Sequence, residues 1–143
     1  MRAVVVDASV AVKWTLPEFL EPLTDRADDL FQQYLRGQID LVVPDLFWSE
    51  LANFLWKSVR QKKIPGTRAE DALKTIIARN IKTVSSREVL SEALSIAIQF
   101  DRTAYDSIYV ALAVALNTHL ITADERLANA LAAHLPVKWL GSF

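Results

Sequence analysis

The sequence predicts an α/β fold built on a central parallel sheet. Short runs of aliphatic and β-branched residues, typical of strands buried on both faces, alternate along the chain with longer stretches of helical periodicity. This alternation is typical of parallel strands joined by right-handed helical crossovers. The chain has 143 residues, 52% of them hydrophobic, with only three glycines and five prolines. We therefore expect one domain over residues 1–143, with a large core and no linker.

The first expected strand, residues 3–6, is the apolar run Ala-Val-Val-Val, and it stops at Asp7. Ser9 offers a cap for a helix expected over residues 9–16, which Pro17 ends. In open parallel sheets, ligands bind just beyond the carboxyl ends of the strands. Asp7 is therefore either a helix cap or part of the floor of an active site.

The rest of the chain repeats this alternation. Amphipathic spacing, caps and breaker residues predict helices over residues 25–36, 45–61, 67–79, 86–100, 104–116 and 124–133. Short apolar runs predict strands over residues 41–43, 82–84, 119–122 and 137–140. We expect Gly37 to end the helix before it and Asp45 to cap the helix after it.

The expected helix over residues 45–61 is apolar on almost every side. Such a helix is either deeply buried or covered by a partner on its second face, and the residues leave both alternatives open. Glu50 is the single acid inside this apolar stretch. Because an unpaired carboxylate is costly to bury, Glu50 calls for a counter-charge or a metal ion.

Four acids stand where elements begin or end. Asp7 and Asp124 follow strands, whereas Glu50 and Asp106 lie near the starts of helices. A single acid of this kind is most often a helix cap. Four at one edge of the sheet would instead raise their pKa values, spread apart or hold cations. Oxygen ligands without nearby Cys or His favour Mg²⁺ or Mn²⁺ over zinc, and such sites support in-line displacement at phosphorus.

Two hydroxyl residues and one basic cluster leave alternatives open. Ser9 and Thr122 either orient water and hold the acids by hydrogen bonds, or they are plain helix and turn caps. The basic cluster around the end of the third expected helix either contacts phosphates or is a solvated helix end; its members are Lys57, Arg60, Lys62, Lys63 and Arg68.

Several function classes are excluded or disfavoured by composition. The chain has no cysteine, which excludes disulfides, zinc–thiolate sites and cysteine nucleophiles. Glycine occurs only at positions 37, 66 and 141, so phosphate-binding and dinucleotide-binding loops are missing. The N-terminal apolar run is too short for a signal peptide, and the run from Ile108 to Leu116 is half a membrane span. We therefore expect a cytoplasmic protein with no membrane association.

Four segments in order resemble the PIN-domain ribonucleases, and the chain length and motif order are similar to the VapC-type toxins of toxin–antitoxin pairs. The segments are Val6-Asp7-Ala8-Ser9, residues 48–53 (Trp-Ser-Glu-Leu-Ala-Asn), residues 105–113 (Tyr-Asp-Ser-Ile-Tyr-Val-Ala-Leu-Ala) and residues 120–127 (Leu-Ile-Thr-Ala-Asp-Glu-Arg-Leu). The resemblance covers essentially the whole chain and is weakest between Glu50 and Asp106.

The resemblance implies a PIN-like three-layer α/β/α fold with about five parallel strands. It also implies a Mg²⁺- or Mn²⁺-dependent endoribonuclease that acts as the toxin of a toxin–antitoxin pair. Asp7, Glu50, Asp106 and Asp124 would be the catalytic and metal-binding acids. The implied partners are RNA, a small antitoxin protein and a second copy of the chain, with a higher toxin–antitoxin assembly possible. The antitoxin is expected on the apolar surface around Trp14, Phe19, Trp48, Phe54 and Trp56.

Alternative functions fit the residues less well. A PIN-like nuclease outside a toxin–antitoxin pair and a catalytically inactive α/β interaction module both stay open. A phosphatase that uses Asp7 as its nucleophile needs a second Asp two residues later, where this chain has Ser9. A phospho-accepting receiver needs an acid pair after its first strand, and Asp7 stands there alone.

Overall fold

In a computed structural model of the chain, residues 2–15 and 22–143 are described. Their five strands form one sheet of parallel neighbours, in the order β3-β2-β1-β4-β5, which confirms the predicted fold class. The strands are β1 (Arg2–Val6), β2 (Ile39–Pro44), β3 (Lys82–Val84), β4 (Leu120–Thr122) and β5 (Val137–Trp139). The expected helix end at Leu16, the break at Pro17 and the expected antitoxin contact Phe19 lie outside the described residues.

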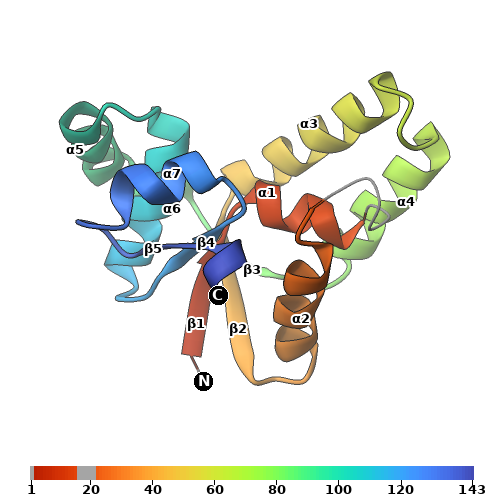
Figure 1. The fold of residues 1–143 in the computed structure, drawn as a ribbon, viewed down its shortest axis with the longest axis horizontal. Helices are drawn as coiled ribbons and strands as arrows, with labels where there is room; N and C mark the ends of the chain where they lie inside the picture. The colour runs from red at the N-terminus through yellow and green to blue at the C-terminus, as the bar shows by residue number, and fades with distance from the viewer. Residues whose placement is uncertain (1, 16–21) are drawn as a thin grey trace.

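Helices cover both faces of the sheet. Figure 1 shows α5, α6 and α7 on one side and α1 to α4 on the other, which makes three layers. The α-helices are α1 (Ala8–Ala11), α2 (Thr24–Leu35), α3 (Leu46–Arg60), α4 (Gly66–Ile77), α5 (Leu90–Phe100), α6 (Ala104–Ala115) and α7 (Glu125–Leu131). The 3-10 turns are η1 (Val12–Trp14), η3 (Ser86–Val89) and η4 (Leu140–Ser142).

The central strand β1 is where the chain changes direction across the sheet. After β1 the chain builds β2 and β3 on one side, and it then crosses over to add β4 and β5 on the other. Ligands of open parallel sheets bind at such a switch point, beyond the carboxyl ends of the strands. The switch point here lies between the ends of β1 and β4.

The core holds β1 rigidly from both faces. Val4, Val5 and Val6 are at most 1% exposed. Helix α6 contacts β1, β2 and β4, and its residues 107–113 are all buried. Burial of this kind stabilises the native state by about 25 cal/mol for each Å² of apolar surface removed from water. Asp7, which follows β1 directly, is therefore attached to one of the least mobile parts of the fold.

Helix α3 is not deeply buried on every side, so that alternative for the third expected helix is wrong. Phe47, Leu51 and Leu55 point into the core and are at most 3% exposed, but Trp56 is 52% exposed. The three buried residues repeat every four positions, so one face suffices to pack α3 against the fold. Leu46, Trp48 and Val59 are partly buried against the core, whereas Phe54 and Trp56 stay at the surface.

Several element boundaries differ from the prediction by one or more residues. The first helix is a single α-turn followed by η1, and the helix expected over residues 86–100 begins with η3 before α5. Helix α7 ends at Leu131 instead of residue 133. In the described part of the chain, no helix has both the length and the apolarity to span a membrane.

Candidate active site

Asp7 lies at the switch point and is bracketed by two hydroxyl groups. The register pairs Val6 with Ile121, so the next residues, Asp7 and Thr122, lie side by side. The Thr122 hydroxyl donates to Asp7 Oδ2 at 2.6 Å, and the Ser9 hydroxyl donates to Asp7 Oδ1. Asp7 is only 8% exposed and Thr122 is fully buried. Both carboxylate oxygens therefore have a protein donor.

Two backbone N–H groups set the direction of these hydroxyl protons. Ala123 N donates to Ser9 Oγ at 3.1 Å, and Asp124 N donates to Thr122 Oγ1 at 3.1 Å. Because each hydroxyl oxygen already accepts from a backbone N–H, its own proton is free to be given to Asp7. The turn after β4 thus orients the carboxylate that follows β1.

Neither Ser9 nor Asp45 caps the helix that it was expected to cap. Asp7 occupies the N-cap position of α1 without a side-chain capping bond, and the Ser9 hydroxyl is used on Asp7. Asp45 precedes α3, also without a capping bond, because its carboxylate accepts from the backbone N–H and the hydroxyl of Ser86. These hydrogen bonds lower the pKa of Asp45.

Glu50 has a partner that sequence reasoning missed. The Tyr109 hydroxyl donates to Glu50 Oε1 at 2.6 Å, which links α6 to α3. Burial and then the Glu50 charge raise the pKa of Tyr109, so the phenol keeps its proton and stays a donor. Tyr109 lies three residues after Asp106, on the same helix face, and that spacing is the signal that would have pointed to it.

Asp106 and Asp124 both lie at helix N-termini. Asp106 is in the first turn of α6, where its backbone N–H donates to the Thr103 side chain at 3.1 Å. Asp124 is the N-cap of α7, and its Oδ1 accepts from Leu127 N at 3.2 Å. For Asp124, the capping role that the sequence left open is present. One oxygen serves the cap, and the side chain is exposed.

The charges of the four acids act on one another. Burial is the largest influence on Asp7 and raises its pKa to about 6; the Ser9 and Thr122 hydrogen bonds oppose this, and the charges of Glu50 and Asp106 add to it. Burial also raises the pKa of Glu50 and that of Asp106, the latter with help from Asp124. The site is therefore an anionic centre around the buried Asp7 carboxylate, and it favours protons or cations.

The chemistry of the donor atoms suits a hard divalent cation. It consists of carboxylates and hydroxyls, without sulfur or imidazole, and oxygen ligands are what Mg²⁺ and Mn²⁺ select. Within residues 2–15 and 22–143, no three Asp, Glu, His or Cys side chains are arranged so that they could hold a metal ion. Ser9 and Thr122 are thus hydrogen-bonded to Asp7. Glu50, Asp106 and Asp124 interact with the other acids only through their charges.

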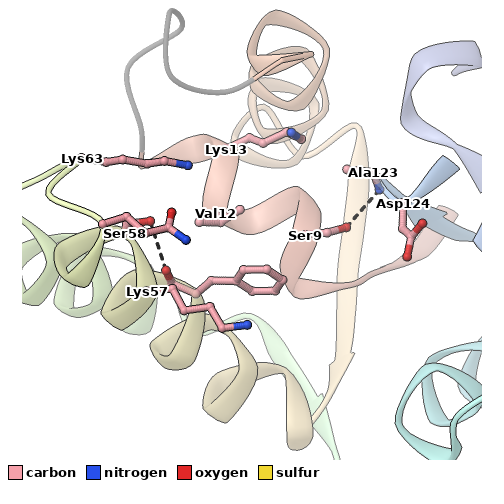
Figure 2. Close-up of a pocket in the computed structure, with 10 residues that line it drawn as sticks. Ser9, Val12, Lys13, Lys57, Ser58, Lys63, Ala123 and Asp124 are labelled. Atoms are coloured by element: carbon pink, nitrogen blue, oxygen red, sulfur yellow. Dashed lines mark hydrogen bonds between the residues drawn. The ribbon is translucent and has the colours of Figure 1, made fainter. Parts of the chain in front are cut away.

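A pocket of about 400 Å³ opens beside these acids. Figure 2 shows Ser9 near its middle, Asp124 at one end and Lys63 at the other. Helices α1 and α3 and the turn after β4 supply its walls. Of the four acids, Asp124 lines this hollow, which is large enough for a ligand.

Comparisons with known proteins agree with this geometry. A family model described as PIN domain matches residues 4–131. "Ribonuclease VapC3" of Pyrobaculum aerophilum is 33% identical over 131 residues, which is 90% of this chain and 95% of the relative. "Ribonuclease VapC9" of Mycobacterium tuberculosis is 34% identical over 100 residues, 68% of this chain and 75% of the relative.

Two solved structures share the fold. The crystal structure of PAE2754 from Pyrobaculum aerophilum superposes with a TM-score of 0.73 at 20% identity, covering 99% of this chain and 85% of that one. The structure of VapBC2 from Rickettsia felis bound to a DNA fragment from their promoter gives a TM-score of 0.65 at 11% identity, covering 96% and 98%.

Proposed function

This chain belongs to the PIN domain family, and on that premise we propose that it is a Mg²⁺- or Mn²⁺-dependent endoribonuclease, the toxin of a toxin–antitoxin pair. The curated relatives that are named VapC ribonucleases support the class of activity. The observation that carries the proposal is Asp7. It is a buried carboxylate with two hydroxyl donors and anionic neighbours, at the switch point of a parallel sheet.

In this proposal Asp7, Glu50, Asp106 and Asp124 hold the cation. When bound, Mg²⁺ or Mn²⁺ supplies activation of the attacking water and stabilisation of the leaving oxygen of a phosphodiester. Ser9 and Thr122 keep the Asp7 oxygens oriented and prevent the carboxylate from rotating.

Tyr109 serves Glu50 in the same way as the two hydroxyls serve Asp7. Its donated proton stabilises the charged form of Glu50 and limits its side chain to one orientation. In metal sites of proteins, a carboxylate that binds the metal is typically hydrogen-bonded to a further side chain that orients it.

The proposal includes two partners besides RNA and places the protein in the cytoplasm, where an RNA substrate is available. A small antitoxin protein would cover the exposed apolar side chains of α3, among them Phe54 at 37% and Trp56 at 52% exposed. A second copy of the chain would form a homodimer. Sedimentation equilibrium of the purified chain, alone and with the co-expressed antitoxin, tests both assemblies.

The function is tested by incubating purified protein with single-stranded RNA and either Mn²⁺, Mg²⁺ or a chelator. We expect cleavage only with a divalent cation, and its loss in Asp7→Ala and Asp106→Asn. Asp71→Asn, a change of an exposed acid on α4, is the matched control and should cut RNA like the wild type. Cleavage that persists in chelator, or in both site variants, would contradict the proposal.

The toxin role has its own test. We expect expression of the wild-type chain to arrest growth and Asp7→Ala to relieve the arrest. Unimpaired growth with the wild type, combined with RNA cleavage in the purified protein, would leave a PIN-domain nuclease without a toxin role.

A further inference from the structure

Three adjoining hollows form one groove across the acidic site. The pocket beside Ser9 and Asp124 shares Phe54 and Lys57 with a second hollow of about 330 Å³ that Glu50 also lines. The second hollow shares Leu46, Ser49 and Tyr105 with a third, of about 400 Å³, that reaches Asp45 and Ser86. We name this continuous surface the α3 groove. It passes two of the four acids, so a chain lying in it would cross the site.

The first hollow of the α3 groove carries three lysines. Lys57 and Lys63 line it, together with Lys13, and Figure 2 shows Lys57 and Lys63 on the α3 side of the pocket, away from Asp124. Within the described residues neither Lys57 nor Lys63 has an ion pair. Their ammonium groups are thus available to a ligand anion, and Lys57 belongs to the last turn of helix α3.

The structure divides the basic cluster into two groups. The Arg60 guanidinium lies over the Trp56 ring at 5.4 Å, and Arg68 donates to Thr15 O at 3.1 Å, so both have partners within the protein. Lys62 lines none of the hollows of the groove. The helix dipole explains why basic residues gather near the C-terminal end of α3. It does not explain why Lys57 and Lys63 line the groove beside the acids.

Two exposed aromatic rings lie along the same groove. Phe54, 37% exposed, stands at the boundary between the first and second hollows, and Tyr105, 62% exposed, between the second and third. Grooves that bind single-stranded nucleic acid combine a basic track for phosphates with aromatic side chains on which unpaired bases stack. The α3 groove has both.

We propose that four side chains of the α3 groove place the RNA substrate across the acids, with backbone phosphates at Lys57 and Lys63 and unpaired bases stacked on Phe54 and Tyr105. The inference deepens the proposed function, on which it rests, by naming the side chains that position the substrate. Duplex RNA is disfavoured because its bases are already stacked and cannot reach the two rings.

Fluorescence anisotropy of a labelled short single-stranded RNA, in chelator so that nothing is cut, tests the groove. Each lost phosphate contact flattens the dependence of log K on log salt by about 0.7 for a single strand. We therefore expect Lys57→Ala/Lys63→Ala to flatten it by about 1.4, two such contacts. The matched control, Lys62→Ala/Lys74→Ala, has the same change in charge and should leave both slope and affinity unchanged.

The aromatic residues give a different signature. We expect Phe54→Ala and Tyr105→Ala each to weaken binding by roughly fivefold to a hundredfold without changing the salt slope, because stacking releases no counterions. Tyr105→Phe should retain the affinity, since it keeps the ring. Trp56→Ala removes an exposed ring of α3 outside the groove and is the control. Circular dichroism of every variant verifies folding.

The outcomes separate this inference from the proposed function. Groove variants that bind RNA like the wild type, or a duplex that binds as tightly as the single strand, would overturn the inference even if the wild type cuts RNA with Mn²⁺. Conversely, binding that depends on the groove in a chain that cuts no RNA with Mn²⁺ or Mg²⁺ would support the inference and overturn the nuclease.

Discussion

Asp7 shows how burial and hydrogen bonds together set the protonation state of one carboxylate. Burial and anionic neighbours raise its pKa, while two hydroxyl donors lower it without cancelling the effect of burial. The donors come from Ser9, two residues away, and from Thr122, which is distant in sequence but adjacent in the sheet. A carboxylate in this balance ionises at a modest cost, which a bound cation would offset.

At the residue scale, Thr122→Val tests the positioning role of the hydroxyl. The variant keeps the shape of the side chain but removes the donor to Asp7 and the acceptor for Asp124 N. We expect about 10- to 100-fold weaker Mn²⁺ binding, measured by isothermal titration calorimetry, because a ligand carboxylate loses its orienting partner. RNA cleavage should fall with it.

The control for this variant is Thr118→Val. Thr118 also donates to β1, at Ala3 O, but at the opposite end of the strand from the site. Its loss should affect stability and leave Mn²⁺ affinity as in the wild type. Equal affinities in wild type and Thr122→Val would show that Thr122 does not position Asp7.

The raised pKa of Asp7 predicts a pH-dependent stability. The folded pKa of about 6 exceeds the ordinary value of 3.8, so the folded state binds the proton more tightly. The free energy of unfolding then falls as pH rises from about 4 to about 7, by about 3 kcal/mol for this group. Asp7→Asn lacks the titration, so we expect its stability relative to the wild type to increase over that range in the presence of chelator.

Urea denaturation of both proteins across this pH range measures the difference. Asp71→Asn, at an exposed position, serves as the control and should follow the wild type. A constant difference between Asp7→Asn and wild type at all pH values would mean that Asp7 is not the titrating group.

At the element scale, α6 organises one wall of the site. It carries Asp106 in its first turn and Tyr109 one turn later, so one helix presents an acid and the hydroxyl that holds Glu50 on α3. The helix begins where Thr103 accepts from Asp106 N. The cap therefore fixes the backbone of Asp106, a proposed metal ligand, as well as the start of the helix.

The cap of α6 is tested by Thr103→Ala. Loss of an N-cap hydroxyl costs about 1 kcal/mol, so we expect the melting temperature to fall by about 3–5 °C for a chain of this size. RNA cleavage should also fall, because the first turn that carries Asp106 frays. Thr103→Ser keeps a capping hydroxyl and should restore both; a Ser variant as impaired as the Ala variant would assign the effect to the lost methyl group.

At the scale of the whole molecule, the strand order brings distant segments to one point. Asp7 follows β1, Asp124 follows β4, Glu50 lies on the helix after β2, and Asp106 lies on the helix that leads into β4. All strands are parallel, so their carboxyl ends share one edge. A cation bound there would connect elements from both sides of the sheet.

Cation binding should therefore stabilise the entire fold. At a free Mn²⁺ concentration of one hundred times Kd, we expect the wild type to gain about 2.7 kcal/mol in free energy of unfolding, seen as a higher Tm in scanning calorimetry. Asp7→Ala should show no comparable gain, whereas Glu70→Ala, on the exposed surface of α4, should respond like the wild type. Equal gains in all three proteins would place the cation elsewhere.

Much of the fold was predictable because local patterns determine it. The apolar runs before Asp7 and Asp124 and the amphipathic spacing of α2 and α4 predicted strands and helices close to the observed ones. Boundaries failed where backbone geometry depends on packing, as in the 3-10 turns η1 and η3. That residues 1–143 act as one domain stays a prediction, as does the metal-binding role of the four acids.

By itself, the sequence determined the α/β class, the parallel strands and the family, because periodicity and short motifs are local properties of the chain. Only the tertiary structure decided what single side chains do. In the structure the Ser9 and Thr122 hydroxyls donate to Asp7, and the Tyr109 hydroxyl donates to Glu50. The Asp45 carboxylate accepts from Ser86 and does not cap a helix. These contacts join residues by strand register and helix packing, and a hydroxyl or carboxylate in a sequence carries no information about which partner it will face.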